Sequence, residues 1–235
     1  MSVRVLFLAT YFPRPTNARM GTWSLDHATA LRDSGMEVEV VSLTPWFPSA
    51  LGVLWKASRT YSQCPQHAVL NGLNVQYPRW LCYPIKQCQR LMNRFPALLT
   101  KLGWLSARRK ILQTVRSTAP DVIVANHSMV SGYVAMQIKR HSAIPFITVD
   151  HEVGDFLVCL ENPERLRLLQ SVVNEAAVSV TVSKAMQTLA ESTVPEGRFQ
   201  TIYNGAGFRE CPLELLDRHK EKTDITIFCC GNLYG

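Results

Sequence analysis

Residues 120–155 read PDVIVANHSMVSGYVAMQIKRHSAIPFITVDHEVGD, and this run indicates the class of fold. Asp121–Asn126 and Pro145–Asp150 are short apolar stretches rich in β-branched residues, which are typical of buried strands. Between them, apolar residues recur at helical spacing and share one face: Val130, Val134 and Ile138. A strand, a helix and a second strand in this order predict two parallel strands joined by a crossover helix.

The same alternation extends along the chain on both sides of this unit. Five further apolar runs are strand candidates: Val3–Thr10, Glu37–Leu43, Leu73–Tyr77, Val178–Val182 and Phe199–Tyr203. A second helical face is formed by Leu166, Leu169 and Val173. We therefore expect an α/β fold with a Rossmann-like, doubly wound, mostly parallel sheet. Thr44–Asn71, which contains prolines and tryptophans, interrupts the alternation and is interpreted as a loop at the carboxyl edge of the sheet.

The last part of the chain has a different character. Gly205–Asp224 is polar, contains a proline and the charged run DRHKEK, and is interpreted as a linker. Ile225–Cys230 follows it as an apolar strand without a helix after it. A buried strand needs neighbours and a cover on each face. We therefore expect residues 1–207 to form one domain, and residues 208–235 to be a linker plus the first strand of a second domain.

Composition limits the classes of function. Of 235 residues, 47% are hydrophobic and 18% are charged, which favours a packed globular domain over disorder. The net charge of +7 favours an anionic partner, although mild basicity also serves solubility. The seven cysteines form no CxxC pair, so neither a structural zinc site nor a disulfide framework is expected, and a reducing cytosol fits. No run approaches the roughly 20 apolar residues that span a bilayer, and the N-terminal run lacks a signal-peptide cleavage site.

Ligands of open parallel sheets bind where the strands end. After the first predicted strand comes YFPRPTNARMGTWSLDHATAL, in which Gly21 permits close backbone approach and Thr22 is placed to cap the following helix. A helix N-terminus offers N–H groups to a phosphate, so these two residues are candidates for such a contact. The loop lacks the GxGxxG and P-loop patterns of dinucleotide and ATP sites. A purely structural turn is the alternative interpretation of the glycine.

Two histidines follow neighbouring strands at the same predicted edge. His127 comes directly after Asn126, and His151 is followed by carboxylates that include Asp155. Because parallel strands end at one edge, both rings are in a position to face one cleft. A hydrogen-bonded structural role is the alternative for each ring. A metal site is not expected, because nothing in the pattern makes the possible ligands converge.

Taken in order, these stretches resemble a known family. The glycine loop with its helix, PDVIVANHS, IPFITVDHEVGD, VSVTVSKAM, FQTIYNGAGF and the closing ITIFCCGNLYG follow one another as in the N-terminal half of a family 4 glycosyltransferase of the GT-B fold. The likeness covers nearly the whole chain and is most specific at SKAM, YNG and GNLY. Without the resemblance, Ser183 is explained as a helix cap, and Asn204 with Gly205 as a turn.

The resemblance implies hexosyl transfer from a nucleotide-sugar donor to a polysaccharide or lipid-linked acceptor, with retention of configuration and without a metal or other cofactor. It also implies that Gly21 and Thr22 approach the donor diphosphate and that His151 lies at the reaction centre. The remaining candidates line the acceptor cleft: Asn126, His127, Asp155, Ser183 and Asn204. Backbone N–H groups and cations would stabilise the charge of the leaving diphosphate.

The likeness is incomplete in places. Family members often read His-Gly-x-Asp where this sequence has HEVGD (151–155), and the usual Asn-Gly-Val-Asp ends here as NGAG (204–207), without its acid. In the family, a basic pair and paired glutamates of the C-terminal domain hold the nucleotide, and these are not present in the 235 residues. We therefore expect this polypeptide alone to be inactive. The alternative is a non-catalytic Rossmann-like binding module, or a truncated remnant that needs a partner chain.

The segment YPIKQCQRLMNRFPALLTKLGWLSARRK (83–110) indicates a surface partner. If one helix runs through it, four apolar side chains line one face: Leu91, Phe95, Leu98 and Leu102. Four cations then fall within an arc of about 40° beside that face. They are Arg90, Arg94, Lys101 and Arg108. Pro96 and Gly103 interrupt this pattern, and a helix that restarts at Pro96 is the alternative.

A basic segment with an apolar edge fits an anionic lipid surface. Such a contact would make the protein cytoplasmic and peripheral on the inner face of the plasma membrane. An ordinary amphipathic helix that covers the sheet is the other interpretation. A nucleic-acid partner is not expected, because the cations are dispersed and the aromatic residues lack the regular interleaving of a base-stacking surface.

Overall fold

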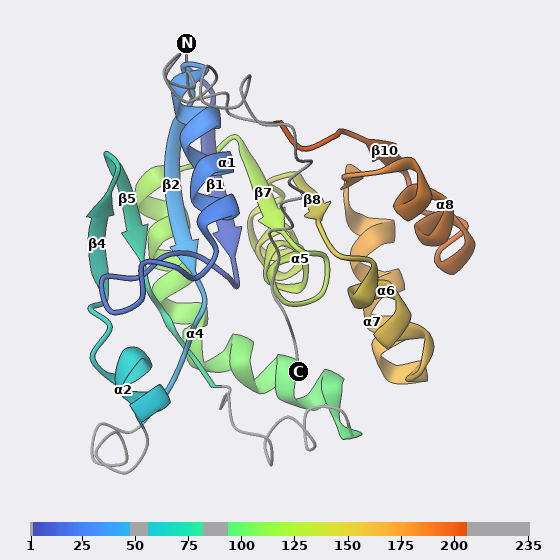
Figure 1. The fold of residues 1–235 in the computed structure, drawn as a ribbon, viewed down its shortest axis with the longest axis horizontal. Coiled ribbons are helices and arrows are strands. Elements are labelled where there is room, and N and C mark those ends of the chain that lie inside the picture. The colour runs from blue at the N-terminus through green and yellow to red at the C-terminus, as the bar shows by residue number, and fades with distance from the viewer. Residues whose placement is uncertain (1, 48–55, 82–93, 206–235) are drawn as a thin grey trace, which may run out of the picture. The chain divides into compact units, whose positions relative to one another are not determined.

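The computed structural model describes residues 2–47, 56–81 and 94–205. Strands alternate with helices along most of that length (Figure 1). The strands are β1 Arg4–Ala9, β2 Glu37–Ser42, β3 Thr44–Pro45, β4 His67–Leu70, β5 Leu73–Gln76, β6 Arg79–Trp80, β7 Val122–Asn126, β8 Phe146–Asp150, β9 Val178–Thr181 and β10 Phe199–Thr201. The helices are α1 Thr22–Asp33, α2 Lys56–Ser62, α4 Pro96–Thr118, α5 Val130–Ser142, α6 Val153–Leu160, α7 Pro163–Glu175 and α8 Lys184–Thr193.

The main sheet carries its strands in the spatial order β10-β9-β8-β7-β1-β2-β5-β4. Neighbouring strands are parallel except β4 and β5, which form an antiparallel hairpin. The chain order reverses between β1 and β7, because β2 and β5 lie on one side of this pair and β8, β9 and β10 lie on the other. The sheet is therefore doubly wound, as the sequence predicts, and β1 and β7 form its switch point.

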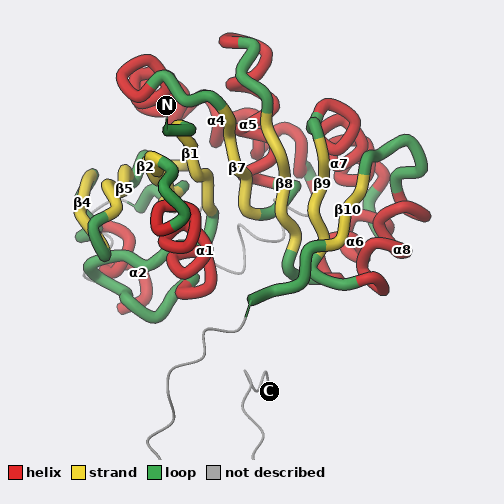
Figure 2. The backbone as a smooth tube through the Cα atoms, turned by 90° about the horizontal axis from the view of Figure 1, so that it is seen from above, coloured by secondary structure: helices red, strands yellow, loops and turns green. Residues whose placement is uncertain are grey.

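Alternate residues of β1 enter two cores on opposite faces of the sheet. Val5 and Phe7 pack in the same core as Ala28 of α1. Leu6 and Leu8 pack in a second core with side chains from α4, α5 and α7. Figure 2 shows α1 on one side of the sheet and α4, α5 and α7 on the other. Because both faces of the central strands are covered, their sequences are apolar almost throughout.

The predicted loop at Thr44–Asn71 is wrong in part. This stretch contains β3, α2 and β4, while residues 48–55 lie outside the described residues. The chain turns from β4 into β5 at Asn71 and Gly72, whose φ angles are 48° and 77°. An Asn-Gly pair with positive φ at both positions is the commonest signal of a two-residue hairpin turn. The sequence therefore contains the signal for this hairpin, although the interpretation as a loop missed it.

The predicted amphipathic segment does not form one continuous helix. α4 begins at Pro96 with Phe95 as its N-cap, which is the restart that the sequence offered as the alternative. Gly103 lies within α4, where a methyl group would come within 2.2–2.6 Å of ring atoms of Trp80. Because Trp80 belongs to β6, which pairs with β3 just after the end of β2, the first turns of α4 lie at the carboxyl edge of the sheet (Figure 1).

The chain divides into two compact units, Met1–Tyr203 and Asn204–Gly235. The predicted boundary after residue 207, most of the predicted linker and the closing strand lie outside the described residues and stay predictions. In the part of the chain that the structure describes, no helix is long and apolar enough to cross a membrane.

Candidate functional site

The switch point brings three ring-bearing residues together at the carboxyl edge of the sheet. Tyr11 follows β1, His127 follows β7 and His151 follows β8. The ring centroids of His127 and His151 are 5.7 Å apart, and those of His127 and Tyr11 are 5.9 Å apart. The two histidines therefore lie side by side at the place where ligands of doubly wound sheets bind.

Asn126 links these segments to α1. Its side chain is fully buried. Its Nδ2 donates to Oγ of Ser24 at 2.5 Å, and its Oδ1 lies 2.7 Å from Nε2 of His151. Ser24 is buried in the first turn of α1, so one amide connects α1, β7 and the end of β8. Because Asn126 has no exposed surface, it is placed to orient His151 rather than to touch a ligand.

This hydrogen bond determines which nitrogen of His151 carries the proton. The Asn126 amide directs its NH₂ group to Ser24 and its oxygen to the imidazole. An amide oxygen only accepts hydrogen bonds, so Nε2 of His151 must be the donor. In the neutral ring, Nδ1 is then the basic nitrogen. His151 is half-buried. Its hydrogen bond to Asn126 therefore orients a ring that lies at the protein surface.

His127 lies in a strained turn that a buried carboxylate holds in place. Its φ is 78°, a left-handed conformation that is uncommon for residues other than glycine. Its N–H donates to the carbonyl oxygen of Val149 at 2.8 Å. The next N–H, that of Ser128, donates to Oδ1 of Asp150 at 2.7 Å, and the Ser128 hydroxyl also contacts this carboxylate. These contacts fix the buried imidazole of His127 at the switch point.

Gly21 and Thr22 begin α1 in a way that the sequence predicts only in part. Gly21 is the N-cap with a φ of 71°, and no side chain caps the helix, so the predicted cap role of Thr22 is wrong. A Cβ atom on Gly21 would lie 2.4–2.6 Å from backbone atoms of Tyr11 and Phe12. The close approach that this glycine permits is therefore to the protein's own backbone. Thr22 is exposed at the carboxyl edge, where the first turn of α1 presents its N–H groups.

The predictions from sequence missed two aromatic residues at this edge. The Trp23 ring lies 6.3 Å from that of Tyr11, so Trp23, Tyr11, His127 and His151 form a continuous ring row. The row runs from the first turn of α1 across the ends of β1, β7 and β8. No local pattern marks Tyr11 or Trp23, because the two rings become neighbours only when α1 packs beside β1.

The other predicted cleft residues lie on separate parts of the chain. Ser183 caps α8 as predicted, because its Oγ accepts a hydrogen bond from the N–H of Met186 at 3.2 Å. Asp155 lies on α6, the helix that follows His151. Asn204 is exposed and belongs to the second compact unit.

The predicted membrane cations lie on or next to α4, apart from Arg90, which is outside the described residues. The other three are exposed: Arg94, Lys101 and Arg108.

Two titratable groups near this edge have pKa values that burial lowers. Arg14, in the loop that precedes Gly21, is buried, and its guanidinium lies 5.1 Å from the centroid of the Tyr61 ring. Desolvation lowers the pKa of Arg14. Burial also lowers the pKa of His27, whose ring meets Phe7 edge-on at 5.3 Å. Both groups pack against aromatic rings, so neither adds to the surface charge beside the ring row.

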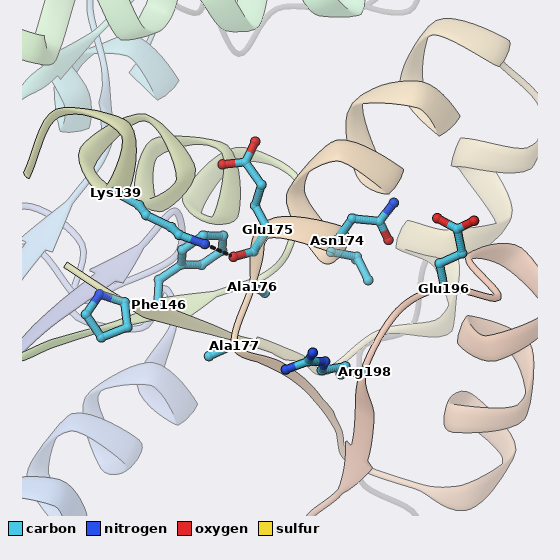
Figure 3. A pocket seen from close by; sticks show the side chains of 10 residues that line it. Lys139, Phe146, Asn174, Glu175, Ala176, Ala177, Glu196 and Arg198 are labelled. Carbon is cyan, nitrogen blue, oxygen red and sulfur yellow. Dashed lines mark hydrogen bonds between the residues drawn. The ribbon is translucent and has the colours of Figure 1, made fainter. Parts of the chain in front are cut away.

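A separate hollow of about 400 Å³ lies at the opposite edge of the sheet. Charged side chains of both signs line it, including Lys139, Glu175 and Arg198 (Figure 3). Phe146 at the start of β8 also lines it, and Arg198 directly precedes β10, so the hollow lies where these strands begin. Nζ of Lys139 donates to the carbonyl oxygen of Glu175 at 2.6 Å. This hollow is therefore separate from the histidines, which follow the strands at their carboxyl ends.

Among the described residues, no group of three or more histidines, cysteines, aspartates or glutamates is arranged to hold a metal ion.

Comparison of the sequence with protein families finds one match that covers most of the chain. The sequence profile of Glycosyltransferase Family 4 matches residues 20–206. A search of curated proteins finds no significant match.

Solved structures share the fold at low sequence identity. A sucrose-phosphate synthase from Thermosynechococcus elongatus matches with a TM-score of 0.59 at 10% identity, over 93% of this chain and 98% of that one. UGT89C1 of Arabidopsis thaliana, complexed with quercetin, matches with a TM-score of 0.51 at 14% identity, over 95% of this chain and 56% of that one. HepE of Anabaena, in complex with UDP and glucose, matches with a TM-score of 0.50 at 17% identity, over 93% of this chain and 50% of that one. The chain thus spans about half the length of the last two.

Proposed function

Since the chain belongs to Glycosyltransferase Family 4, we propose that it forms the acceptor side of an enzyme that transfers a hexosyl group from a nucleotide-sugar to a glycan or lipid-linked acceptor. The observation that carries this proposal is the cluster of His127, His151 and Asn126 at the switch point. The solved structures support the donor class, because HepE is complexed with UDP and glucose on the same fold.

The proposed roles follow from where each group lies. His151 is at the reaction centre, with its ring held by Asn126. His127 supports the acceptor cleft from the neighbouring strand end. The first turn of α1, with Thr22 exposed, offers N–H groups to the donor diphosphate. Gly21 contributes by setting the start of this helix rather than by touching the donor, because its open side is filled by the backbone of Tyr11.

The proposed reaction retains configuration and needs no metal. The bond between C1 of the sugar and the diphosphate oxygen breaks, and the acceptor hydroxyl oxygen forms a new bond to C1 on the same face. A diphosphate oxygen then takes the acceptor proton, so no protein side chain has to act as general base. The developing negative charge on the diphosphate is met by backbone N–H groups, whose fixed dipoles need no reorganisation during the reaction.

The test of this function is transfer of label from UDP- and GDP-[14C]hexoses to glycan and lipid-linked acceptors. The protein is expressed from its entire reading frame and compared with the 235-residue polypeptide. We expect the former to transfer label in the presence of EDTA, with retained configuration at the anomeric proton by NMR, and the latter to be inactive. Turnover by the 235 residues alone would contradict the second expectation. Glycan binding without transfer from any nucleotide-sugar would favour the non-catalytic binding module instead.

The exposed face of α4 supports contact with an anionic membrane. Its apolar side chains, together with that of its N-cap, are 36–54% exposed: Phe95, Leu98, Leu102 and Leu105. Three exposed cations lie nearby: Arg94, Lys101 and Arg108. The buried face of α4 packs on the sheet through Trp104 and Ile111, so the fold does not need the exposed stripe. Each cation near anionic lipid contributes about 1 kcal/mol.

The position of this face suits a lipid-linked acceptor. The first turns of α4 lie at the carboxyl edge of the sheet (Figure 1). The two histidines also lie at this edge, because they directly follow β7 and β8. A membrane on this face would therefore lie beside the proposed acceptor cleft. We place the protein on the cytoplasmic side, peripheral at the inner face of the plasma membrane.

Sedimentation with phosphatidylcholine vesicles, with and without phosphatidylglycerol, tests the membrane contact. We expect binding that requires the anionic lipid and that falls severalfold when Leu98 and Leu102 are both changed to serine. The control is Val69→Ser, because Val69 is 60% exposed on the edge strand β4 and does not belong to α4. Equal binding to neutral vesicles, or equal loss in the control, would contradict the proposed contact.

A further inference from the structure

The ring row at the carboxyl edge changes character along its length. Its inner members, His127 and His151, are buried and half-buried. Its outer members, Tyr11 and Trp23, are 45% and 40% exposed. Phe12, which directly follows Tyr11, is fully buried. Two large aromatic rings therefore remain at the surface directly beside the proposed reaction centre.

The backbone around Tyr11 is anchored on both sides. Thr10, the preceding residue, places its Oγ1 3.0 Å from Oγ of Ser131 in α5. Phe12, the following residue, packs in the core under α1. The carbonyl group of Tyr11 lies against Gly21, with no room for a side chain between them. The Tyr11 ring thus projects from a fixed stretch of chain.

The backbone around Trp23 is anchored in the same way. Gly21 holds the start of α1 against the end of β1. Ser24, the residue after Trp23, is buried and accepts the hydrogen bond from Asn126. Asn126 also holds His151, so Trp23 and the proposed reaction centre are positioned by one set of hydrogen bonds. A site on anchored elements of this kind is suited to orient a ligand.

The chemistry of a pyranose matches this arrangement. One face of the ring carries several axial C–H groups, whose slightly positive hydrogens pack on the negative face of an aromatic ring. The equatorial hydroxyls point outward from the rim, where polar side chains can reach them. Small-molecule sites commonly combine aromatic walls with a few polar groups that fix orientation. Tyr11 and Trp23 provide such a wall, and His151 provides a polar group at its inner end.

We propose that Tyr11 and Trp23 form a stacking subsite for the acceptor, and that the accepting unit is a pyranose with one apolar face. The stacked ring directs a hydroxyl towards His151. This inference rests on the proposed function. It narrows the acceptor from any glycan or lipid-linked molecule to one whose accepting end is a hexopyranose. A lipid alcohol without a sugar offers no face for these rings.

Saturation-transfer difference NMR on the 235-residue chain tests the subsite without any turnover. The probes are methyl β-D-glucopyranoside, methyl β-D-galactopyranoside and, as an acyclic control, sorbitol. Irradiation of the aromatic protons of the protein should saturate the axial C–H protons on one face of a pyranoside and leave sorbitol unsaturated. No transfer to either pyranoside, or equal transfer to sorbitol, would overturn the proposal.

Matched variants connect the signal to the two rings. Tyr11→Leu and Trp23→Leu should each reduce the transfer about fivefold or more, because the aromatic face is lost while an apolar side chain remains. Trp46→Leu is the control, since Trp46 is also 40% exposed but lies after β3 and outside the ring row. Both test positions are exposed, so far-UV circular dichroism should show an unchanged fold. Equal signals in all three variants would overturn the proposal.

The transfer assay separates this inference from the proposed function. In the protein from the entire reading frame, Tyr11→Leu should raise the acceptor KM about fivefold and leave the donor KM unchanged. Transfer with an unchanged acceptor KM would overturn the subsite while the glycosyltransferase function stands. Pyranoside binding that depends on Tyr11, without transfer from any nucleotide-sugar, would support the subsite and contradict the proposed function.

Discussion

Replacing Gly21 with alanine should destabilise the domain strongly. The added methyl group would lie 2.4–2.6 Å from backbone atoms of Tyr11 and Phe12, and the φ of 71° is left-handed. For a residue with a Cβ atom this conformation costs about 1–2 kcal/mol, and overpacking adds about 1–3 kcal/mol. The lower entropy of the unfolded alanine chain offsets roughly 0.4–1 kcal/mol. The expected loss of unfolding free energy is therefore about 1–5 kcal/mol.

Gly35→Ala is the matched control for this prediction. Gly35 also has a left-handed φ, 90°, but nothing lies within 4 Å of the added methyl group. The control should lose only the cost of the left-handed conformation less the entropy offset, about 0–1.6 kcal/mol. Urea unfolding of both variants, followed by circular dichroism at an unchanged m-value, measures the difference. The excess loss at Gly21 reports the close contact with the backbone after β1.

Equal losses in the two variants would refute the packing argument for Gly21. A different outcome would restore the role that the family resemblance implies. If Gly21→Ala kept its stability but lost nucleotide-sugar binding, the open side of this glycine would face the donor diphosphate rather than Tyr11.

Three further predictions concern single side chains. Gly103→Ala should lower the unfolding free energy by about 1–3 kcal/mol, because the methyl group meets the ring of Trp80. Inside a helix this change usually raises stability, so a gain in stability would contradict that contact. Ser183→Ala should lose about 1 kcal/mol with the helix cap, whereas Thr22→Ala should stay within about 0.5 kcal/mol; the reverse order in urea unfolding would contradict the assigned caps. Burial lowers the pKa of His27, so the unfolded chain binds this proton first as the pH falls, and stability should decrease below about pH 6.5. This decrease should be shallower in His27→Gln, and identical slopes for the two proteins in urea unfolding between about pH 7 and pH 5 would be evidence against it.

The fold was largely predictable from sequence because its strands are covered on both faces. β1, β7 and β8 are short apolar runs, and each was expected within one or two residues of its observed bounds. β4 was missed although Asn71 and Gly72 carry the hairpin signal. Its sequence, HAVL, is short and half-exposed, so the apolar pattern that marked the central strands is weak there.

The site was predictable only as far as strand ends are visible in the sequence. His127 and His151 each follow an apolar run, and parallel strands end at one edge, so their proximity could be expected. The contact between Asn126 and Ser24 joins residues 102 positions apart, and no local pattern indicates it. The same holds for the pairing of Tyr11 with Trp23, which depends on how α1 packs beside β1.

The most direct test of the account compares the two edges of the sheet. Label transfer from nucleotide-sugar to acceptor is measured for the protein from the entire reading frame, for His151→Ala and for Lys139→Ala, which alters the hollow at the opposite edge. We predict that His151→Ala lowers kcat about 100-fold or more, as expected for a polar group at the reacting centre, while Lys139→Ala keeps a kcat near that of the unaltered protein. Full activity in His151→Ala, together with a loss of activity in Lys139→Ala, would place the chemistry at the edge where the strands begin and would contradict the proposed site.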